Sequence, residues 1–211
     1  MGISPVDVPG YDPDREILFR KIEYPIANIN NEINSYQDRL GVEILARFQK
    51  AGIGPAVLAE LKIGYNDRYL VYPYVQEYGN CYAARCVFSE RQEDFFWHGD
   101  EQFFADQHHI YNIQDIQRCE NGALFVCQGE ENLLALKQLG FPGVAVPDCR
   151  SLELLDPERF AFVQMVFIVM ENNAESEAAA RTVAAGMGYK ARLFRWPTLL
   201  ARNYNLWQFR L

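Results

Sequence analysis

The segment from Leu124 to Gly140 (LFVCQGEENLLALKQLG) is the feature that most constrains the fold of this chain. Its first residues are apolar and predict a buried strand, Gly129 predicts a sharp turn, and leucines at helical spacing after Glu130 predict a helix. A strand that runs directly into a helix is the building unit of α/β proteins, and such proteins bind ligands at the turn between the two. We therefore expect an α/β fold with its chemistry at the end of this strand.

Strand-like and helical segments continue to alternate after this unit. The expected strands are residues 123–128, 143–146, 165–170 and 190–194. The expected helices are residues 130–139 and 174–187, with another near 152–160. This alternation predicts a four-stranded parallel sheet flanked by helices. The continuous apolar run at 165–170 fits a strand that is covered on both faces.

The preceding part of the chain follows a different pattern. Apolar residues at helical spacing over 14–49, interrupted at Pro25 and Gly41, predict two or three helices, and a short helix is expected over 56–61 with Gly64 at its end. Aromatic and β-branched runs between 69 and 97, with turns at 77–80 and 89–94, predict an antiparallel meander. We expect an α+β portion of helices and an antiparallel sheet.

Composition restricts the class of protein. A chain of 211 residues with 49% hydrophobic content buries a sizeable core, and a net charge of −8 argues against a broad non-specific coat of nucleic acid. No stretch reaches the roughly 20 apolar residues of a membrane span, and the first residues lack a secretory signal, so we expect a cytoplasmic protein without a membrane partner. The five cysteines form no C-x-x-C pair, so no zinc is expected.

The segment 124–140 resembles the signature of the Toprim domain, the metal-binding half of bacterial and phage DNA primases, topoisomerases and related nucleases. That signature has Glu at the position of Gln128 and Asp at the position of Asn132. Other primase-like segments follow in the family's order and extend the resemblance over about 45–205: residues 50–65, 70–73 with Gly79 and Arg85, 109–112, 168–180 and 202–205.

The resemblance implies a domain organisation. Residues 1–13, rich in proline and glycine, are expected to be an arm or linker, and residues 14–116 a primase-core-like α+β domain. A Toprim domain over 117–197 and a C-terminal tail over 198–211 complete the chain. By this resemblance, we expect the chain to be the core of a primase-like protein without the zinc-binding domain that precedes this core in full primases.

The resemblance also implies a site. Its catalytic positions are Gln128, Glu171 and Asn173. The positions that would hold Mg²⁺ or Mn²⁺ are Glu171, Gln128, Asn132, Asn173 and Asn203. Arg85 matches an arginine that meets nucleotide or template phosphate, as a guanidinium suits such a contact, and Gly129 is required by the turn.

Four of the five metal positions carry amides, and only Glu171 keeps a negative charge. Because Mg²⁺ prefers charged oxygen ligands, we expect its binding to be weak or absent. Displaced acids are the alternative ligands: Glu130, Glu131, Glu175 and Glu177. The competing interpretation of these four is structural, since carboxylates in the first turn of a helix stabilise it.

Three functions remain open at this point. The favoured hypothesis is a primase-like Toprim module of a DNA replication or mobile-element protein, with an impaired or absent metal site, that binds nucleic acid or a partner. The second is an active, Mg²⁺-dependent DNA primase that makes RNA primers, and the third is a protein-binding scaffold. Expected partners are single-stranded DNA or a nucleotide, and a helicase or another replication protein.

One aromatic cluster has two interpretations. Its members could stack on bases, but core and interdomain packing is the more common role of such residues. They are Phe95, Phe96, Trp97, Phe103 and Phe104.

Overall fold

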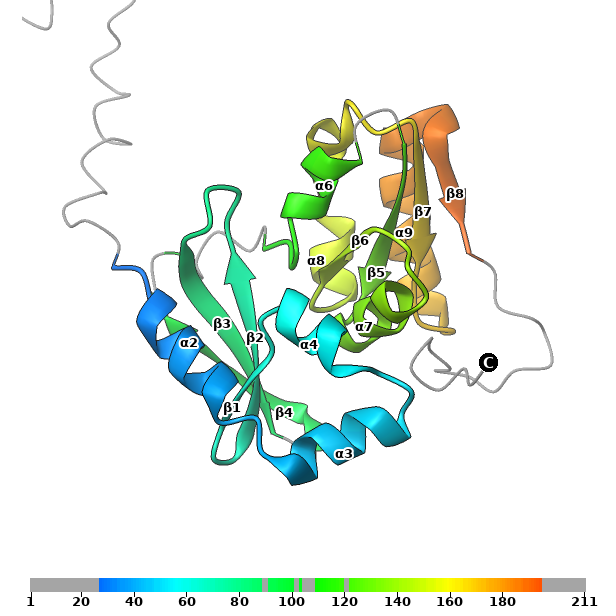
Figure 1. The fold of residues 1–211 in the computed structure, drawn as a ribbon. Helices are drawn as coiled ribbons and strands as arrows, with labels where there is room; N and C mark the ends of the chain where they lie inside the picture. The colour runs from blue at the N-terminus through cyan, green and yellow to red at the C-terminus, as the bar shows by residue number, and fades with distance from the viewer. Residues whose placement is uncertain (1–26, 89–90, 101–102, 104–108, 120–121, 195–211) are drawn as a thin grey trace, which may run out of the picture.

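Two β-sheets organise the chain, as Figure 1 shows. A computed structural model describes residues 27–88, 91–100, 103, 109–119 and 122–194. The first sheet is antiparallel and the second is parallel, and helices flank both. The α/β class and its two-part arrangement are as expected from the sequence. None of the helices in the described ranges is long and apolar enough to span a bilayer.

The antiparallel sheet has the strand order β1-β2-β3-β4. Its strands are β1 (Gly64–Asn66), β2 (Tyr69–Val75), β3 (Cys81–Phe88) and β4 (Arg91–Gly99). The expectation of a turn over 89–94 is wrong for residues 91–94, which belong to β4. β4 is an edge strand of this sheet and pairs with β3.

Strand β1 is not among the strands that the sequence predicts, because the sequence pattern places Gly64 at the end of a helix. That helix, α4 (Pro55–Glu60), ends earlier, and Gly64 opens β1 instead. A Cβ atom on Gly64 would lie 2.6 Å from the Cβ of Tyr36 in α2 (Asn30–Asp38). The glycine therefore permits close packing of β1 on α2.

The parallel sheet has the strand order β6-β5-β7-β8. Its strands are β5 (Ala123–Gln128), β6 (Gly143–Val146), β7 (Met165–Val169) and β8 (Ala191–Leu193). Helices α7 (Glu130–Gln138) and α9 (Ala174–Met187) lie where the apolar periodicity predicted them. The four expected strands and their parallel pairing are thus confirmed.

The single helix expected near 152–160 is wrong. The chain forms α8 (Cys149–Glu153) and then a separate 3-10 turn, η3 (Pro157–Phe160). Pro157 cannot continue a helix from the preceding turn because it has no backbone N–H. Asp148 and Asp156 cap the two elements separately, accepting hydrogen bonds from the backbone N–H groups of Ser151 and Glu158.

Three apolar clusters fill the molecule. One lies between α2 and the antiparallel sheet, and another between the parallel sheet and α8 and α9. The middle cluster contains Tyr72 and Tyr74 of β2, Leu133 and Leu134 of α7, and Cys127 of β5. Helices α4 and α7 lie between the two sheets in Figure 1, together with α3 (Val42–Lys50) at the lower edge. Both sheets therefore share one core.

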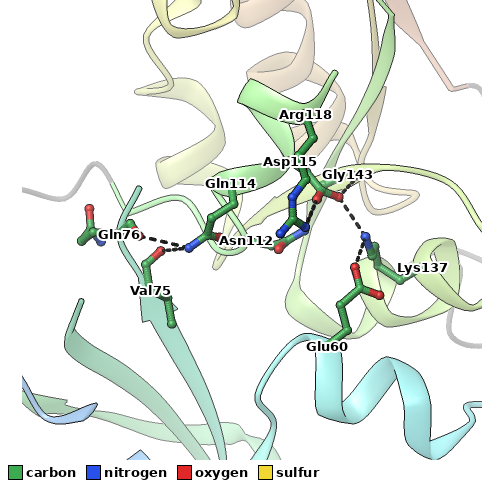
Figure 2. A network of polar contacts seen from close by, with 9 residues as sticks. All are labelled: Glu60, Val75, Gln76, Asn112, Gln114, Asp115, Arg118, Lys137 and Gly143. Atoms are coloured by element: carbon green, nitrogen blue, oxygen red, sulfur yellow. Dashed lines mark hydrogen bonds and ion pairs between the residues drawn. The ribbon is translucent and has the colours of Figure 1, made fainter. Parts of the chain in front are cut away.

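A buried aspartate fixes the connection between the two parts (Figure 2). Asp115, in α6 (Gln114–Arg118), accepts hydrogen bonds at 3.0 Å from the backbone N–H of Gly143 and from Nζ of Lys137. Lys137 also contacts Oε1 of Glu60 at 2.6 Å, and Arg118 contacts Asp115 at 3.2 Å. This network joins α6, α7, α4 and the start of β6.

Two amide side chains of the same segment extend the connection (Figure 2). Gln114 donates from Nε2 to the carbonyl oxygens of Val75 and Gln76, at 3.0 and 3.1 Å. Asn112 donates from Nδ2 to the carbonyl oxygen of Gly143 at 2.8 Å. The end of β2 is therefore tied to the parallel sheet through one short segment.

Candidate functional site

The carboxyl ends of β5 and β7 bring three of the predicted site residues together. Gln128 ends β5, Glu171 follows β7, and Asn173 begins α9 as its N-cap. The backbone N–H of Glu171 faces Oε1 of Gln128 at 3.5 Å, and Nδ2 of Asn173 donates to Oε2 of Glu171 at 3.1 Å. Parallel pairing of β5 with β7 creates this juxtaposition, at the sheet edge where α/β proteins bind ligands.

The orientation of the Asn173 amide is determined by helix capping. Its Oδ1 accepts a hydrogen bond from the backbone N–H of Ser176 at 2.8 Å. Because the oxygen of an amide accepts and its nitrogen donates, this cap leaves Nδ2 toward Glu171. The Glu171 carboxylate is thus met by an N–H donor rather than by a second carboxylate.

The turn after β5 has the backbone conformation that glycine favours. Gly129 has φ +85°, and the nearest atoms to a Cβ built on it lie at 3.8 Å. The conformation, and not a lack of space, explains the glycine. Asn132 is 3% exposed, and its Nδ2 donates to the carbonyl oxygen of Gln128 at 2.6 Å. Its amide therefore closes the turn.

Arg85 lies on β3 and pairs with an acid of the other part of the molecule. Its NH1 is 2.6 Å from Oε2 of Glu130, and the two side chains are 11% and 0% exposed. Oε1 of Glu130 accepts from the hydroxyl of Tyr74 at 2.7 Å. Burial and the nearby charge of Glu130 raise the pKa of Tyr74 well above its usual range, so this hydroxyl stays a donor. Sequence reasoning missed the pair, since its members lie 45 residues apart.

The next acid of the same helix turn behaves differently. Glu131 is half-buried, and its Oε1 accepts from the hydroxyl of Tyr72 at 3.4 Å. Burial, and then the charge of Glu130, raise the pKa of Glu131 to about 7. The first turn of α7 therefore holds one acid in a buried ion pair with Arg85 and one acid whose pKa is raised to about 7.

The remaining predicted residues lie apart from this group or outside the described ranges. Glu175 and Glu177 occupy the first turn of α9, as the structural interpretation predicted. Glu175 accepts from Sγ of Cys149 at 3.2 Å, and Glu177 pairs with Arg181. Asn203 lies outside the described residues. Within those residues, no three His, Cys, Asp or Glu side chains gather in an arrangement that could hold a metal ion.

Comparisons with known proteins place this fold. No protein-family model matches the chain, and no curated protein matches it. Solved structures do match. The primase fragment of the bacteriophage T7 primase-helicase protein has a TM-score of 0.61 at 16% identity, over 71% of this chain and 64% of that fragment.

Two bacterial structures agree with the phage structure. The E. coli primase catalytic core has a TM-score of 0.62 at 16% identity, over 82% of this chain and 72% of that core. A DnaG primase catalytic domain bound to single-stranded DNA has a TM-score of 0.64 at 16% identity, over 85% and 71% of the two chains. The chain therefore has the fold of the catalytic core of bacterial and phage primases.

Proposed function

We propose that this chain is a primase-like Toprim module of a DNA replication or mobile-element protein, that its catalytic metal site is impaired or absent, and that it binds nucleic acid or a partner protein. Residues 117–197 are the Toprim domain in this proposal. The likeness to primase cores supports it, as one of them is bound to single-stranded DNA and another is part of a primase-helicase protein. A helicase is accordingly among the candidate partners.

The contact between Asn173 and Glu171 carries the proposal of an impaired metal site. A divalent cation would need the outward lone pairs of the Glu171 carboxylate, and one of its oxygens already accepts Nδ2 of Asn173. The amide cannot turn its oxygen toward the cation without giving up the cap on Ser176, which is worth about 1 kcal/mol. An N–H group thus already donates to one of the two oxygens with which Glu171 would bind a cation.

The charge of the surrounding donors supports the same conclusion. Gln128 and Asn132 are neutral, and Asn132 directs an N–H toward the backbone of Gln128. Hard cations bind strongly where several carboxylates surround them, and each lost charge removes a large part of the attraction. This donor set does not fit a tightly held Mg²⁺ or Mn²⁺.

Calorimetric titration tests the metal half of the proposal. Titration with Mg²⁺ or Mn²⁺ should reveal no saturable site at sub-millimolar concentration. A saturable site at sub-millimolar concentration would contradict the proposal. It would also favour the active primase, for which Glu131 is the specific support because perturbed acids near neutral pKa are typical of catalytic sites. Primer extension on a single-stranded template with Mg²⁺ would then identify that enzyme.

Salt-dependent binding tests the nucleic-acid half. The logarithm of the affinity of the chain for single-stranded DNA should fall linearly with the logarithm of salt concentration, because bound phosphates release counterions. Absence of binding even at about 50 mM salt would leave the protein-binding scaffold as the function.

A further inference from the structure

A cavity of about 190 Å³ lies between the two parts of the molecule, and its lining does not include Glu171 or Asn173. One wall consists of Phe95, Trp97 and His109. The opposite wall is the segment from Pro147 to Ser151, which follows directly after β6. Since β6 is parallel to β5, this wall lies at the same carboxyl edge of the sheet as Gln128.

The aromatic wall is held in place by its neighbours. The guanidinium carbon of Arg85 lies 4.3 Å from the centroid of the Phe95 ring, and Glu130 in turn fixes Arg85. Phe95 nevertheless remains 45% exposed. A large apolar ring that is supported from behind and open to water is suited to stacking on a flat ligand.

Trp97 and His109 continue this wall. Trp97 contacts the ring of Tyr74 at 4.9 Å and that of His109 at 5.2 Å between centroids. His109 stacks on Phe103 at 4.6 Å with an interplanar angle of 19°. These contacts fix the aromatic wall before any ligand arrives, which lowers the entropy cost of binding.

The opposite wall supplies a positive charge. Arg150 is exposed, and its side chain makes no ion pair with any residue that the structure describes. Asp148 already uses Oδ1 to accept from the backbone N–H of Ser151 at 2.7 Å, so it shapes this wall. A guanidinium beside stacking rings is the combination with which proteins bind the phosphate and base of a nucleotide.

We propose that this cavity binds one nucleotide unit, with its base against Phe95 and Trp97 and its phosphate at Arg150. The proposal rests on the proposed nucleic-acid function and assigns it to residues outside the predicted metal positions. The unit comes either from a single strand or from a free nucleotide. Arg85 is a positioning residue in this arrangement, since it supports the ring of Phe95 from its pair with Glu130.

The neighbouring residue provides a matched control. Phe96 is 41% exposed and lies on the opposite face of β4, where its ring contacts Tyr69 at 4.9 Å. Two affinities are measured for F95A and F96A. Fluorescence anisotropy gives the affinity for a labelled single-stranded oligonucleotide, and calorimetry gives the affinity for ATP without metal. We expect F95A to weaken binding at least about fivefold, the loss of one stacked base, and F96A to change it less than about twofold.

Two further variants separate stacking from folding and from charge. F95L keeps an apolar side chain of similar size but removes the aromatic face, so it should weaken binding as F95A does while melting like the parent. R150Q should weaken oligonucleotide binding and lower the slope of log affinity against log salt by about 0.7, the contribution of one phosphate contact on a single strand. R192Q, an exposed arginine on β8, should leave the slope unchanged.

The outcomes show which ligand occupies the cavity and which of the two proposals fails. Loss confined to the oligonucleotide assigns the cavity to a strand, and loss confined to ATP assigns it to a free nucleotide. If the parent binds either ligand and F95A and F95L bind it equally well, the cavity proposal is wrong while the proposed function stands. If the parent binds neither ligand, the cavity proposal and the nucleic-acid half of the proposed function both fail, and binding of a partner protein is left.

Discussion

The guanidinium of Arg85 lies 2.6 Å from the carboxylate of Glu130, and this ion pair is nearly inaccessible to solvent. It joins β3 of the antiparallel sheet to the first residue of α7, the helix that starts at the candidate site. A phosphate that approached Arg85 would therefore compete with Glu130. The role of Arg85 in nucleic-acid binding remains a prediction, and the structure shows that a bound phosphate must compete with Glu130 for Arg85.

Replacing Glu130 by Gln should destabilise the fold by about 3–5 kcal/mol. The substitution leaves the buried Arg85 charge without its counter-charge, which is costly in a site that excludes water. Chemical denaturation measures this change in unfolding free energy. E177Q breaks the exposed pair with Arg181 and should cost less than about 1 kcal/mol, because water screens that pair.

The double variant R85M/E130L provides the complementary measurement. It removes both charges, so it should cost several kcal/mol less than the sum of the two single substitutions. Additive losses would show that Arg85 and Glu130 do not stabilise one another.

Stability should fall as pH rises from about 4.5 to about 7 because of Glu131. Its pKa is raised from 4.5 to about 7 in the folded chain, so the folded state holds this proton more tightly than the unfolded state in that window. The stabilising contribution is complete below pH 4.5 and lost above pH 7. By linkage, it amounts to roughly 3 kcal/mol.

E131Q should remove this part of the pH dependence. The denaturation midpoints of the parent and of E131Q are measured at several pH values between 4.5 and 8. The difference between the two midpoints isolates the contribution of Glu131, because the contributions of groups that titrate in both proteins cancel. A constant difference between the two proteins across this range would show that Glu131 does not titrate there.

Asn173→Asp should destabilise the chain in the presence of a chelator. The new carboxylate would face Oε2 of Glu171 where an N–H now donates, and the repulsion should cost about 1–2 kcal/mol. The cap on Ser176 survives, since Asp caps as well as Asn. Thermal melting in chelator measures the loss, and Q49E, an equal charge change on the exposed side of α3, serves as control.

Restoring acids at all the predicted metal positions should convert this repulsion into metal binding. The variant carries Gln128→Glu, Asn132→Asp, Glu171→Asp, Asn173→Asp and Asn203→Asp. It should melt below the parent in chelator and recover on addition of Mn²⁺, because an ion that binds only the folded state stabilises it. Equal melting with and without Mn²⁺ would mean that these positions do not form a metal site even when charged.

Gly129→Ala should cost about 1–3 kcal/mol. At φ +85° and ψ 137° a side chain is strained, although no neighbouring atom obstructs it. Gly41 is the matched control, since it caps α3 at φ −69° and no neighbouring atom lies within 4 Å of the position that a Cβ would take. Gly41→Ala should change the unfolding free energy by less than about 1 kcal/mol. Equal losses would contradict the backbone explanation for Gly129.

Local patterns in the sequence determined the parallel half of this fold. These patterns each act over a few residues, so the sequence alone predicted them. They are the apolar runs that form β5 and β7, the glycine turn at Gly129, and the helical spacing in α7 and α9. The meeting of Gln128 with Glu171 also followed, because the ends of adjacent parallel strands share one edge.

Only the tertiary structure decided which groups these residues face. The start of β4 depends on its pairing with β3, and the need for glycine at position 64 depends on the close approach of β1 to α2. The partner of Arg85 lies on a helix 45 residues further along the chain. The direction of the Asn173 amide depends on a cap and a carboxylate together. Such contacts form only when segments that are distant in the sequence pack around a shared core. A local sequence pattern does not predict which distant segments will meet.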